Sequence, residues 1–223
     1  SFAWQNGRQL SSLQKGENVV QYTYNTDGLR LSKNVNGSTT KFYYDDSGNL
    51  FRAGDGTNAV WFFYGTDSAS MSFKYRDVRY YYVKNLQGDV ISITDADGNI
   101  VAEYSYDAWG VPTVLSDTSG QGISHYNPYR YRSYYYDRET GLYYLQSRYY
   151  DPAIGRFINA DVFTSTGQGL LGNNMFAYCN NNPVAYADSE GKLPSSIINP
   201  NAMALDSGCS LRPIPDKERQ DTY

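Results

Sequence analysis

The sequence YTYNTDGL at Tyr22–Leu29 decides the fold, because it returns twenty residues later as FYYDDSGNL at Phe42–Leu50. Two looser copies follow, YSYDAWG at Tyr104–Gly110 and YYYDRETG at Tyr134–Gly141. In each copy, alternating aromatic and polar residues are typical of a β-strand, an Asp or Asn caps the backbone of a turn, and a Gly supplies the positive φ that the turn requires. Each copy therefore predicts a β-hairpin, and the chain is expected to be a series of such hairpins.

Further turn signals favour the same fold class. Asn36-Gly37 and Asp97-Gly98 are typical of two-residue hairpin turns, and the second is flanked by strand patterns at Val90–Thr94 and Ile100–Tyr104. The first 150 residues show no sustained helical periodicity with caps. Only Leu170–Cys179 could form a short helix, and a compact loop is an equal alternative there. We therefore expect an all-β protein.

The composition agrees with β structure and excludes two classes of partner. The chain has 223 residues, enough for one sizeable domain or two small ones, with 24 Tyr against 9 Phe and 3 Trp. Tyr suits a pleated, half-buried surface, where its ring packs and its hydroxyl reaches a polar partner. A net charge of −4 argues against nucleic-acid binding. Apolar runs such as Val60–Tyr64 are far shorter than the ~20 residues of a membrane-spanning helix.

Most catalytic and metal-binding side-chain sets are missing from the sequence. Cys179 and Cys209 are interpreted as two unrelated free thiols, and the one histidine, His125, as a surface or loop residue. No metal cluster and no Cys-His or Ser-His pair is expected, and no cofactor. The chain starts at Ser1 without a Met or a signal segment, which we interpret as a fragment of a longer polypeptide.

A longer segment carries a family resemblance. YRYRSYYYDRETGLYYLQSRYYDP at Tyr129–Pro152, followed by GRFINAD at Gly155–Asp161, resembles the Rhs-repeat-associated core domain, and the hairpin units resemble the YD repeats of rearrangement-hotspot (Rhs) proteins. The resemblance implies a spiral ribbon of antiparallel β-hairpins that forms part of a hollow YD-repeat shell, closed by the Rhs core domain. It implies a shell segment over residues 1–126, the core over 127–191, and a variable, poorly ordered tail over 192–223. A ribbon of hairpins supports this geometry, because it buries its edges only by continuing or by curling on itself.

The resemblance also implies candidate catalytic residues. Members of the Tc-toxin C-component and polymorphic-toxin types cut their own chain just after the core, using two aspartates helped by an arginine. The matching residues are Asp161, Asp188 and Arg148. Two carboxylates held close together cannot both ionise, so one stays protonated while the other takes a proton from the attacking water. Arg148 would hold a carboxylate or stabilise the developing negative charge.

The family's cleavage pattern, counted from Asp188, places the cut at the bond between Lys192 and Leu193. This chain departs from the pattern in two ways. Val162 and Ser189 replace the prolines that usually follow the aspartates, and Lys192 replaces an apolar residue.

Each of these residues also has a purely structural interpretation. Asp161 and Asp188 lie beside turns, where an aspartate commonly caps the backbone. Arg148 lies between Ser147 and Tyr149, and could stack on tyrosines or form a structural ion pair. Asp151-Pro152 is expected to end a strand, without a catalytic role.

The leading hypothesis is a fragment of a cargo-encapsulating β-shell from a secreted or surface toxin-delivery protein of a bacterium. Its enzymatic activity would be at most a single-turnover aspartyl self-cleavage that releases a C-terminal effector. The expected partners are that effector in cis, the remainder of the shell, and an immunity protein for the effector. The alternative is a noncatalytic cell-surface adhesion or carbohydrate-binding scaffold built from the same repeats.

Overall fold

The computed structural model describes residues 1–223 except 57, 67–68, 161–173, 189–190, 192–194 and 197–223. Within the described residues, twelve strands form one antiparallel sheet, and each strand pairs with its neighbours in sequence order. We call this sheet the wall. Its strands are β1 (Phe2–Gln5), β2 (Gln9–Lys15), β3 (Asn18–Tyr24), β4 (Arg30–Val35), β5 (Ser38–Tyr44), β6 (Leu50–Gly54), β7 (Val60–Tyr64), β8 (Ser70–Tyr75), β9 (Val78–Lys84), β10 (Val90–Thr94), β11 (Ile100–Tyr106) and β12 (Pro112–Asp117).

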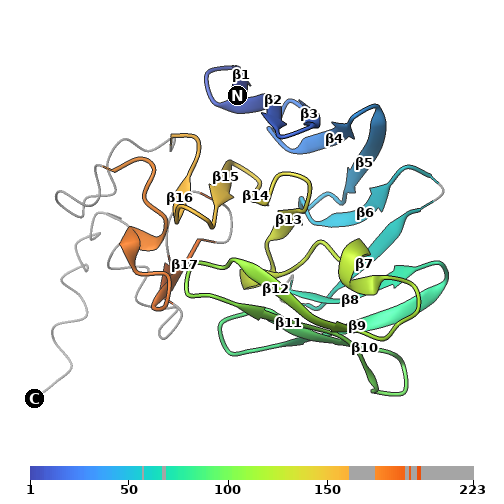
Figure 1. Cartoon of the computed structure of the whole chain (residues 1–223). Helices are drawn as coiled ribbons and strands as arrows, with labels where there is room; N and C mark the ends of the chain where they lie inside the picture. Colours follow the sequence, from blue (N-terminus) through green and yellow to red (C-terminus); the bar gives the residue numbers. More distant parts are fainter. Residues whose placement is uncertain (57, 67–68, 161–173, 189–190, 192–194, 197–223) are drawn as a thin grey trace, which may run out of the picture.

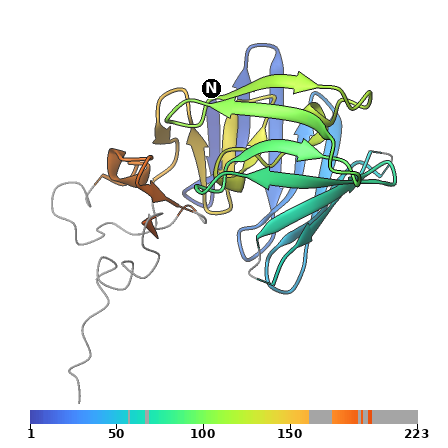
Figure 2. The same ribbon diagram turned by 90° about the horizontal axis from the view of Figure 1, so that it is seen from below.

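The wall curls around a second, smaller sheet (Figures 1 and 2). We call residues 127–160, which hold this sheet, the inner segment. Its four strands pair in the order β13-β14-β15-β16. The wall remains open, with β1 and β12 at its two ends, so the expected all-β fold of antiparallel hairpins is confirmed. The inner strands are β13 (Tyr135–Asp137), β14 (Leu142–Leu145), β15 (Arg148–Asp151) and β16 (Arg156–Phe157).

Two kinds of turn connect the strands of the wall. Asn36-Gly37 forms a two-residue turn between β4 and β5 with φ of 51° and 93°, as the sequence predicted. The loop Asn25–Leu29 has five residues, and the Asn25 side chain caps the backbone N–H groups of Asp27 and Leu29. Between β2 and β6 such loops alternate with tight turns, which explains the spacing of twenty residues between the first two repeats.

The prediction for Asp97-Gly98 was wrong in its turn type. Thr94 pairs with Ile100, so five residues lie between β10 and β11 instead of two. The reason is Asp95, whose carboxylate accepts hydrogen bonds from the backbone N–H groups of Asp97 and Asn99. This side chain stabilises the longer loop over the two-residue turn.

The repeated tyrosines join successive hairpins. Each points from the end of a strand toward the hairpin before it, where its hydroxyl donates to a backbone carbonyl fourteen residues earlier. Donor and acceptor both advance by twenty residues at each step. The abundance of tyrosine in the sequence therefore has a structural cause, because the ring packs in the core and the hydroxyl satisfies a carbonyl. The bonds are Tyr24 to Leu10 (2.8 Å), Tyr44 to Arg30 (3.0 Å) and Tyr64 to Leu50 (2.7 Å).

The hydrophobic core lies between the wall and the inner segment. Phe62 of the wall packs edge-on against Tyr129 at 4.9 Å between ring centroids, and Phe42 packs likewise against Tyr135 at 5.5 Å. A separate cluster gathers Tyr143, Tyr150 and other buried side chains of the inner segment with Tyr178 and Cys179. The inner segment therefore supplies the surface on which the wall buries its concave face.

Three short elements differ from the sequence expectations. The one α-helix of the described residues is α1 (Ile123–Tyr126), a single turn that the pattern did not predict. His125 is exposed, as expected, but it lies on this helix and contacts Arg138. The described part of the expected helix at Leu170–Cys179, residues 174–179, contains no α-helix. Cys179 is a buried free thiol and opens the 3-10 turn Cys179–Asn181, while Cys209 lies outside the described residues.

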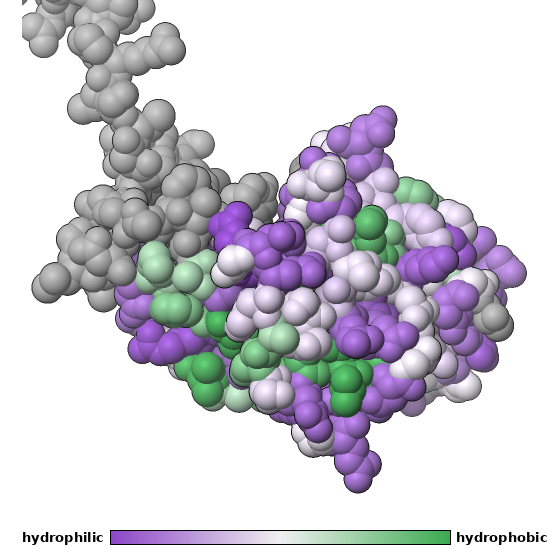
Figure 3. All heavy atoms as spheres, turned by 90° about the horizontal axis from the view of Figure 1, so that it is seen from above, coloured by the Kyte–Doolittle hydropathy of each residue, from purple (hydrophilic) through white to green (hydrophobic). Residues whose placement is uncertain are grey.

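The described part of the tail also contributes to a strand pair. Strand β17 (Tyr186–Ala187) pairs with β18 (Ser195–Ser196), and the rest of the tail that the sequence analysis assigned to residues 192–223 lies outside the described residues. Figure 3 shows one face of the molecule, on which hydrophobic residues lie in small groups among hydrophilic ones. No helix among the described residues is long and apolar enough to cross a membrane.

Candidate functional site

The candidate site lies at the start of β15, where Arg148 contacts Asp188 and Gly191. Arg148 is the first residue of β15 and pairs with Leu145 of β14 across a tight turn. Gln146 in this turn has a φ of 57°, and Ser147 comes directly after it. The alternation of β15 directs the Arg148 side chain over the ring of Phe157, with the guanidinium carbon 3.6 Å from the ring centroid.

Arg148 and Asp188, two of the predicted catalytic residues, are brought together. Arg148 Nη2 donates to Asp188 Oδ2 at 2.8 Å, and the two side chains are only 4% and 2% exposed. Arg148 Nη1 also donates to the carbonyl of Met175 at 3.2 Å. A buried carboxylate of this kind needs such a partner, because an unpaired buried charge is strongly unfavourable.

Two tyrosines complete the surroundings of Asp188. Its backbone N–H donates to the Tyr134 hydroxyl at 2.9 Å, and this hydroxyl lies 3.2 Å from that of Tyr178. Burial raises the pKa of both phenols well above its ordinary value, so both stay neutral. Asp188 is therefore buried among neutral phenols, where it forms its ion pair with Arg148.

The carbonyl of Gly191 enters the same site. Arg148 Nε donates to it at 2.5 Å, and Ser147 Oγ donates to it at 2.6 Å. The sequence analysis did not identify Ser147 or Gly191 as site residues. One signal in the sequence could have indicated Gly191, because it is a glycine three residues after Asp188. Glycine readily adopts a positive φ, and the structure shows a φ of +68° at this residue.

The other predicted site residues have different outcomes. Asp161 and the two residues of the expected cleavage bond, Lys192 and Leu193, lie outside the described residues. Asp151 is the last residue of β15, where the sequence predicted the end of a strand, and it accepts a hydrogen bond from the backbone N–H of Ala153 at 3.0 Å. Among the described residues, no three His, Cys, Asp or Glu side chains come together to hold a metal ion.

A second polar cluster lies between the wall and the inner segment and is buried. Arg30 of β4 donates to both oxygens of Asp137 in β13, and Lys33 bridges Asp137 and Glu139. The guanidinium lies between aromatic rings, 4.4 Å from the centroids of both Phe42 and Tyr144. These contacts pair the charges of the cluster across the two layers, so the cluster fixes how the layers meet.

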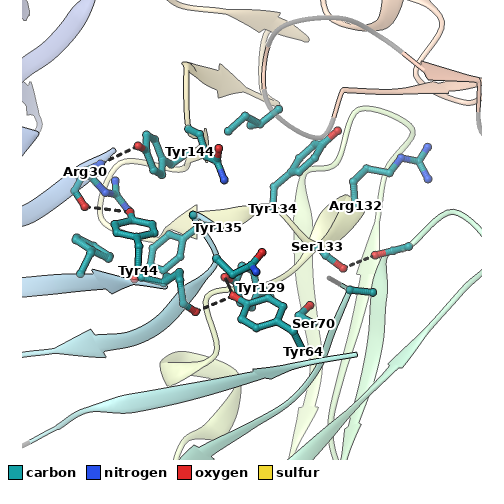
Figure 4. Close-up of a pocket in the computed structure, with 18 of the residues that line it drawn as sticks. Arg30, Tyr44, Tyr64, Ser70, Tyr129, Arg132, Ser133, Tyr134, Tyr135 and Tyr144 are labelled. Carbon is teal, nitrogen blue, oxygen red and sulfur yellow. Dashed lines mark hydrogen bonds between the residues drawn. The ribbon is translucent and has the colours of Figure 1, made fainter. Parts of the chain in front are cut away.

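A cavity of about 430 Å³ lies beside this cluster (Figure 4). Several of its hydroxyl groups are engaged with the protein: Tyr44 donates to the Arg30 carbonyl, and Tyr64 bonds with Tyr129 at 2.8 Å. Figure 4 shows Tyr134 at the far end of the lining from Tyr44 and Tyr64. The cavity thus has apolar ring faces and, among its described lining residues, no cluster of acid and base groups, in contrast to the Arg148–Asp188 site.

Known proteins share this architecture. The family model described as teneurin YD-shell matches residues 56–184. The tRNA nuclease WapA of Bacillus subtilis (strain 168) is 38% identical over 212 residues, which cover 92% of this chain and 9% of WapA. Double-stranded DNA deaminase toxin A of Burkholderia cenocepacia (strain H111) is 33% identical over 111 residues, covering 48% of this chain and 7% of that toxin.

Solved structures show the same fold. The crystal structure of TcdB2-TccC3 matches with a TM-score of 0.66 and 24% sequence identity, covering 85% of this chain and 10% of that one. The chain therefore spans about a tenth of the length of the proteins that it matches.

Proposed function

Because the chain belongs to the teneurin YD-shell family, we propose that it forms part of a cargo-encapsulating β-shell of a toxin-delivery protein and cuts its own backbone just after the core. The proposed partners are a C-terminal effector in cis, the remainder of the shell, and an immunity protein for the effector. The proposed location is outside the producing bacterium, secreted or at its surface. The toxin and nuclease names of the relatives support the delivery role.

The buried contact between Arg148 and Asp188 is the observation that carries the self-cleavage proposal. It supports the proposal because the same guanidinium binds the Asp188 carboxylate and the carbonyl of Gly191, which in sequence precedes the proposed cleavage bond between Lys192 and Leu193 by one residue. A carboxylate used only to cap a turn would not need a buried guanidinium. Burial lowers the local dielectric constant and so strengthens the electrostatic effect of both groups on a developing charge.

The proposed reaction is hydrolysis of one peptide bond. One ionised carboxylate of the pair Asp161 and Asp188 takes a proton from water, and the hydroxide oxygen bonds to the carbonyl carbon of Lys192. The other carboxyl, protonated, gives its proton to the nitrogen of Leu193 as the C–N bond breaks. Positioned acid–base help contributes roughly 10²–10⁴-fold. Tethering adds to this, since the bond and the site share one chain.

Intact-mass spectrometry tests the proposal. The purified wild-type chain, incubated at pH 5 to 7, should yield two fragments whose masses sum to that of the chain plus one water. Asp161→Asn and Asp188→Asn should each stay whole. A wild-type chain that stays intact through prolonged incubation, or variants that are cut as fast, would remove the self-cleavage and leave the shell.

The convex face of the wall favours a second candidate, the adhesion scaffold. Trp61 is 40% exposed, and its ring lies 6.2 Å from that of Phe51. Arg52 stacks between Tyr43 and Trp61, with its guanidinium carbon 4.9 Å and 5.2 Å from the two ring centroids. Flat rings next to guanidinium groups suit a polysaccharide that has apolar sugar faces and carboxylates.

Calorimetric titration with polygalacturonate tests this adhesion candidate. The wild-type chain should bind the polymer, and Trp61→Ala should weaken binding about 5- to 150-fold, which corresponds to a loss of ~1–3 kcal/mol, the range for removing an aromatic ring that stacks on a base. Exposed Leu86 lies in a loop of the wall, so Leu86→Ala is the matched control. Absence of binding by the wild type would exclude this candidate.

A further inference from the structure

The carbonyl oxygen of Gly191 is the acceptor of two hydrogen bonds from adjacent residues at the β14–β15 turn. Arg148 Nε and Ser147 Oγ donate to it at 2.5 Å and 2.6 Å. One donor carries a full charge, and charge-assisted bonds of this length are among the stronger ones in proteins. Because the same guanidinium binds Asp188, the carbonyl is held at a fixed place beside that carboxylate.

Only glycine fits at residue 191. Its φ is +68°, a conformation that L side chains rarely adopt. A Cβ atom there would lie 2.9 Å from the Leu145 carbonyl oxygen, 3.0 Å from Ser147 Oγ and 3.2 Å from the Arg148 Cβ. Two of these neighbours belong to the paired residues of the hairpin and cannot move away without breaking strand contacts.

A second anchor holds the same stretch of chain from the other side. Ala187 pairs with Ser195 and Tyr186 with Ser196, so the residues from 188 to 194 connect two paired strands. The Gly191 carbonyl is therefore bound near the middle of a connection whose ends are also fixed.

We propose that Ser147 and Arg148 form a two-donor clamp that recognises Gly191 as the residue preceding Lys192 and thereby positions the cut bond. This inference deepens the proposed self-cleavage and rests on it. Ser147 is a positioning residue in this scheme, since its hydroxyl touches the chain one residue before Lys192 and takes no proton in the reaction. The clamp also makes the site specific for a segment with glycine at this place.

Rates of self-cleavage test the clamp first. Ser147→Ala should slow the first-order rate by roughly 10²-fold, the effect of a small misplacement of reacting groups. Ser147→Thr, which keeps the hydroxyl, should restore most of the rate, and Gly191→Ala should abolish the cut. Ser105, exposed on β11, gives the matched control Ser105→Ala, whose rate should equal that of the wild type. Equal rates for Ser147→Ala and wild type, with cleavage otherwise active, would overturn the clamp.

Limited trypsin digestion tests the clamp independently of self-cleavage. In an Asp161→Asn chain, which is expected to stay whole, the clamp should protect the bond after Lys192 from trypsin. Adding Ser147→Ala should speed that cut about 3- to 10-fold, as expected for one lost hydrogen bond, with the unfolding midpoint unchanged. If this change is found while the wild-type chain never cuts itself, the clamp is supported and the proposed activity is removed. An unchanged trypsin rate would overturn the clamp alone.

Discussion

The charge cluster between the wall and the inner segment gives the sharpest stability prediction, for the variant Asp137→Asn. Asp137 and Arg30 are both 0% exposed, and the carboxylate accepts from Arg30 at 2.5 Å and 3.2 Å and from Lys33 at 3.0 Å. Replacing the carboxylate removes this partner from two buried cations. Lys33 still contacts Glu139, whose side chain is 23% exposed. Removing one partner of a buried pair costs about 3–5 kcal/mol of unfolding free energy.

Denaturant unfolding followed by tryptophan fluorescence measures this loss. The exposed pair of Lys74 and Asp77 has the same 3.0 Å separation as the Lys33–Asp137 contact, so Asp77→Asn is the matched control, for which no measurable loss is expected. The double variant with Arg30→Met should lose less than the sum of the single losses, because the two residues interact directly. A loss below about 1 kcal/mol for Asp137→Asn would refute the assignment of this cluster to the stability of the interface.

The same cluster predicts how stability depends on acid. Burial raises the pKa of Asp137, but the neighbouring Arg30 and Lys33 charges outweigh it and hold that pKa below its usual value. A carboxyl with a lowered folded pKa stabilises fully above its unfolded pKa of about 4, and this contribution is lost as the pH falls through the folded value. Wild-type stability should therefore drop below about pH 4, and this part of the drop should be absent in Asp137→Asn.

Three further predictions concern the packing of the wall on the inner segment. Burial raises the pKa of Tyr144 to about 12. The stability that its neutral form contributes is therefore complete below pH ~10 and is lost as the pH rises toward 12. Tyrosinate absorbance and circular dichroism should change together over this pH range. Gly110→Ala should lower the free energy of unfolding about 1–3 kcal/mol more than Gly37→Ala in denaturant unfolding. Both glycines have a positive φ, but a Cβ atom at Gly110 would lie 2.5 Å from the Tyr131 ring, whereas one at Gly37 would have no neighbour within 4 Å. Equal losses would contradict this reasoning. Tyr64→Phe should lower the free energy of unfolding by about 1–3 kcal/mol in the same assay, because removing the hydroxyl removes two hydrogen bonds of 2.7 Å and 2.8 Å. An unchanged unfolding midpoint would show that these bonds do not stabilise the fold.

Hairpins could be predicted from the sequence because their signals are local. Asn36-Gly37 supplies both positive φ values of its turn, and the alternation of aromatic and polar residues fixes which face of each strand is buried. The prediction for Asp97-Gly98 failed for a reason of the same kind. Asp95, two residues earlier, competes for the same backbone groups and stabilises a longer loop.

Contacts between distant segments could not be predicted from local signals. Arg30 and Asp137 are 107 residues apart, and nothing near either residue indicates that they pair. Arg148 and Asp188 were identified together only through the family resemblance, and Ser147 and Gly191 were missed. A hydroxyl beside an arginine and a glycine near an aspartate are common neighbours, so their chemistry emerges only once the fold has joined them.

The location of the proposed cut has a consequence for the shell. The contacts described between the wall and the inner segment, such as Arg30 with Asp137 and Phe62 with Tyr129, involve residues that precede Gly191. Hydrolysis of the bond between Lys192 and Leu193 would therefore leave each of these contacts within one fragment. Of the strand pairs in the described residues, only the two-residue ladder of β17 with β18 joins the two sides of such a cut. Two residues of pairing are too few to hold a strand in place alone. The geometry thus separates the residues that stabilise the shell from the bond whose hydrolysis would detach the C-terminal part of the chain.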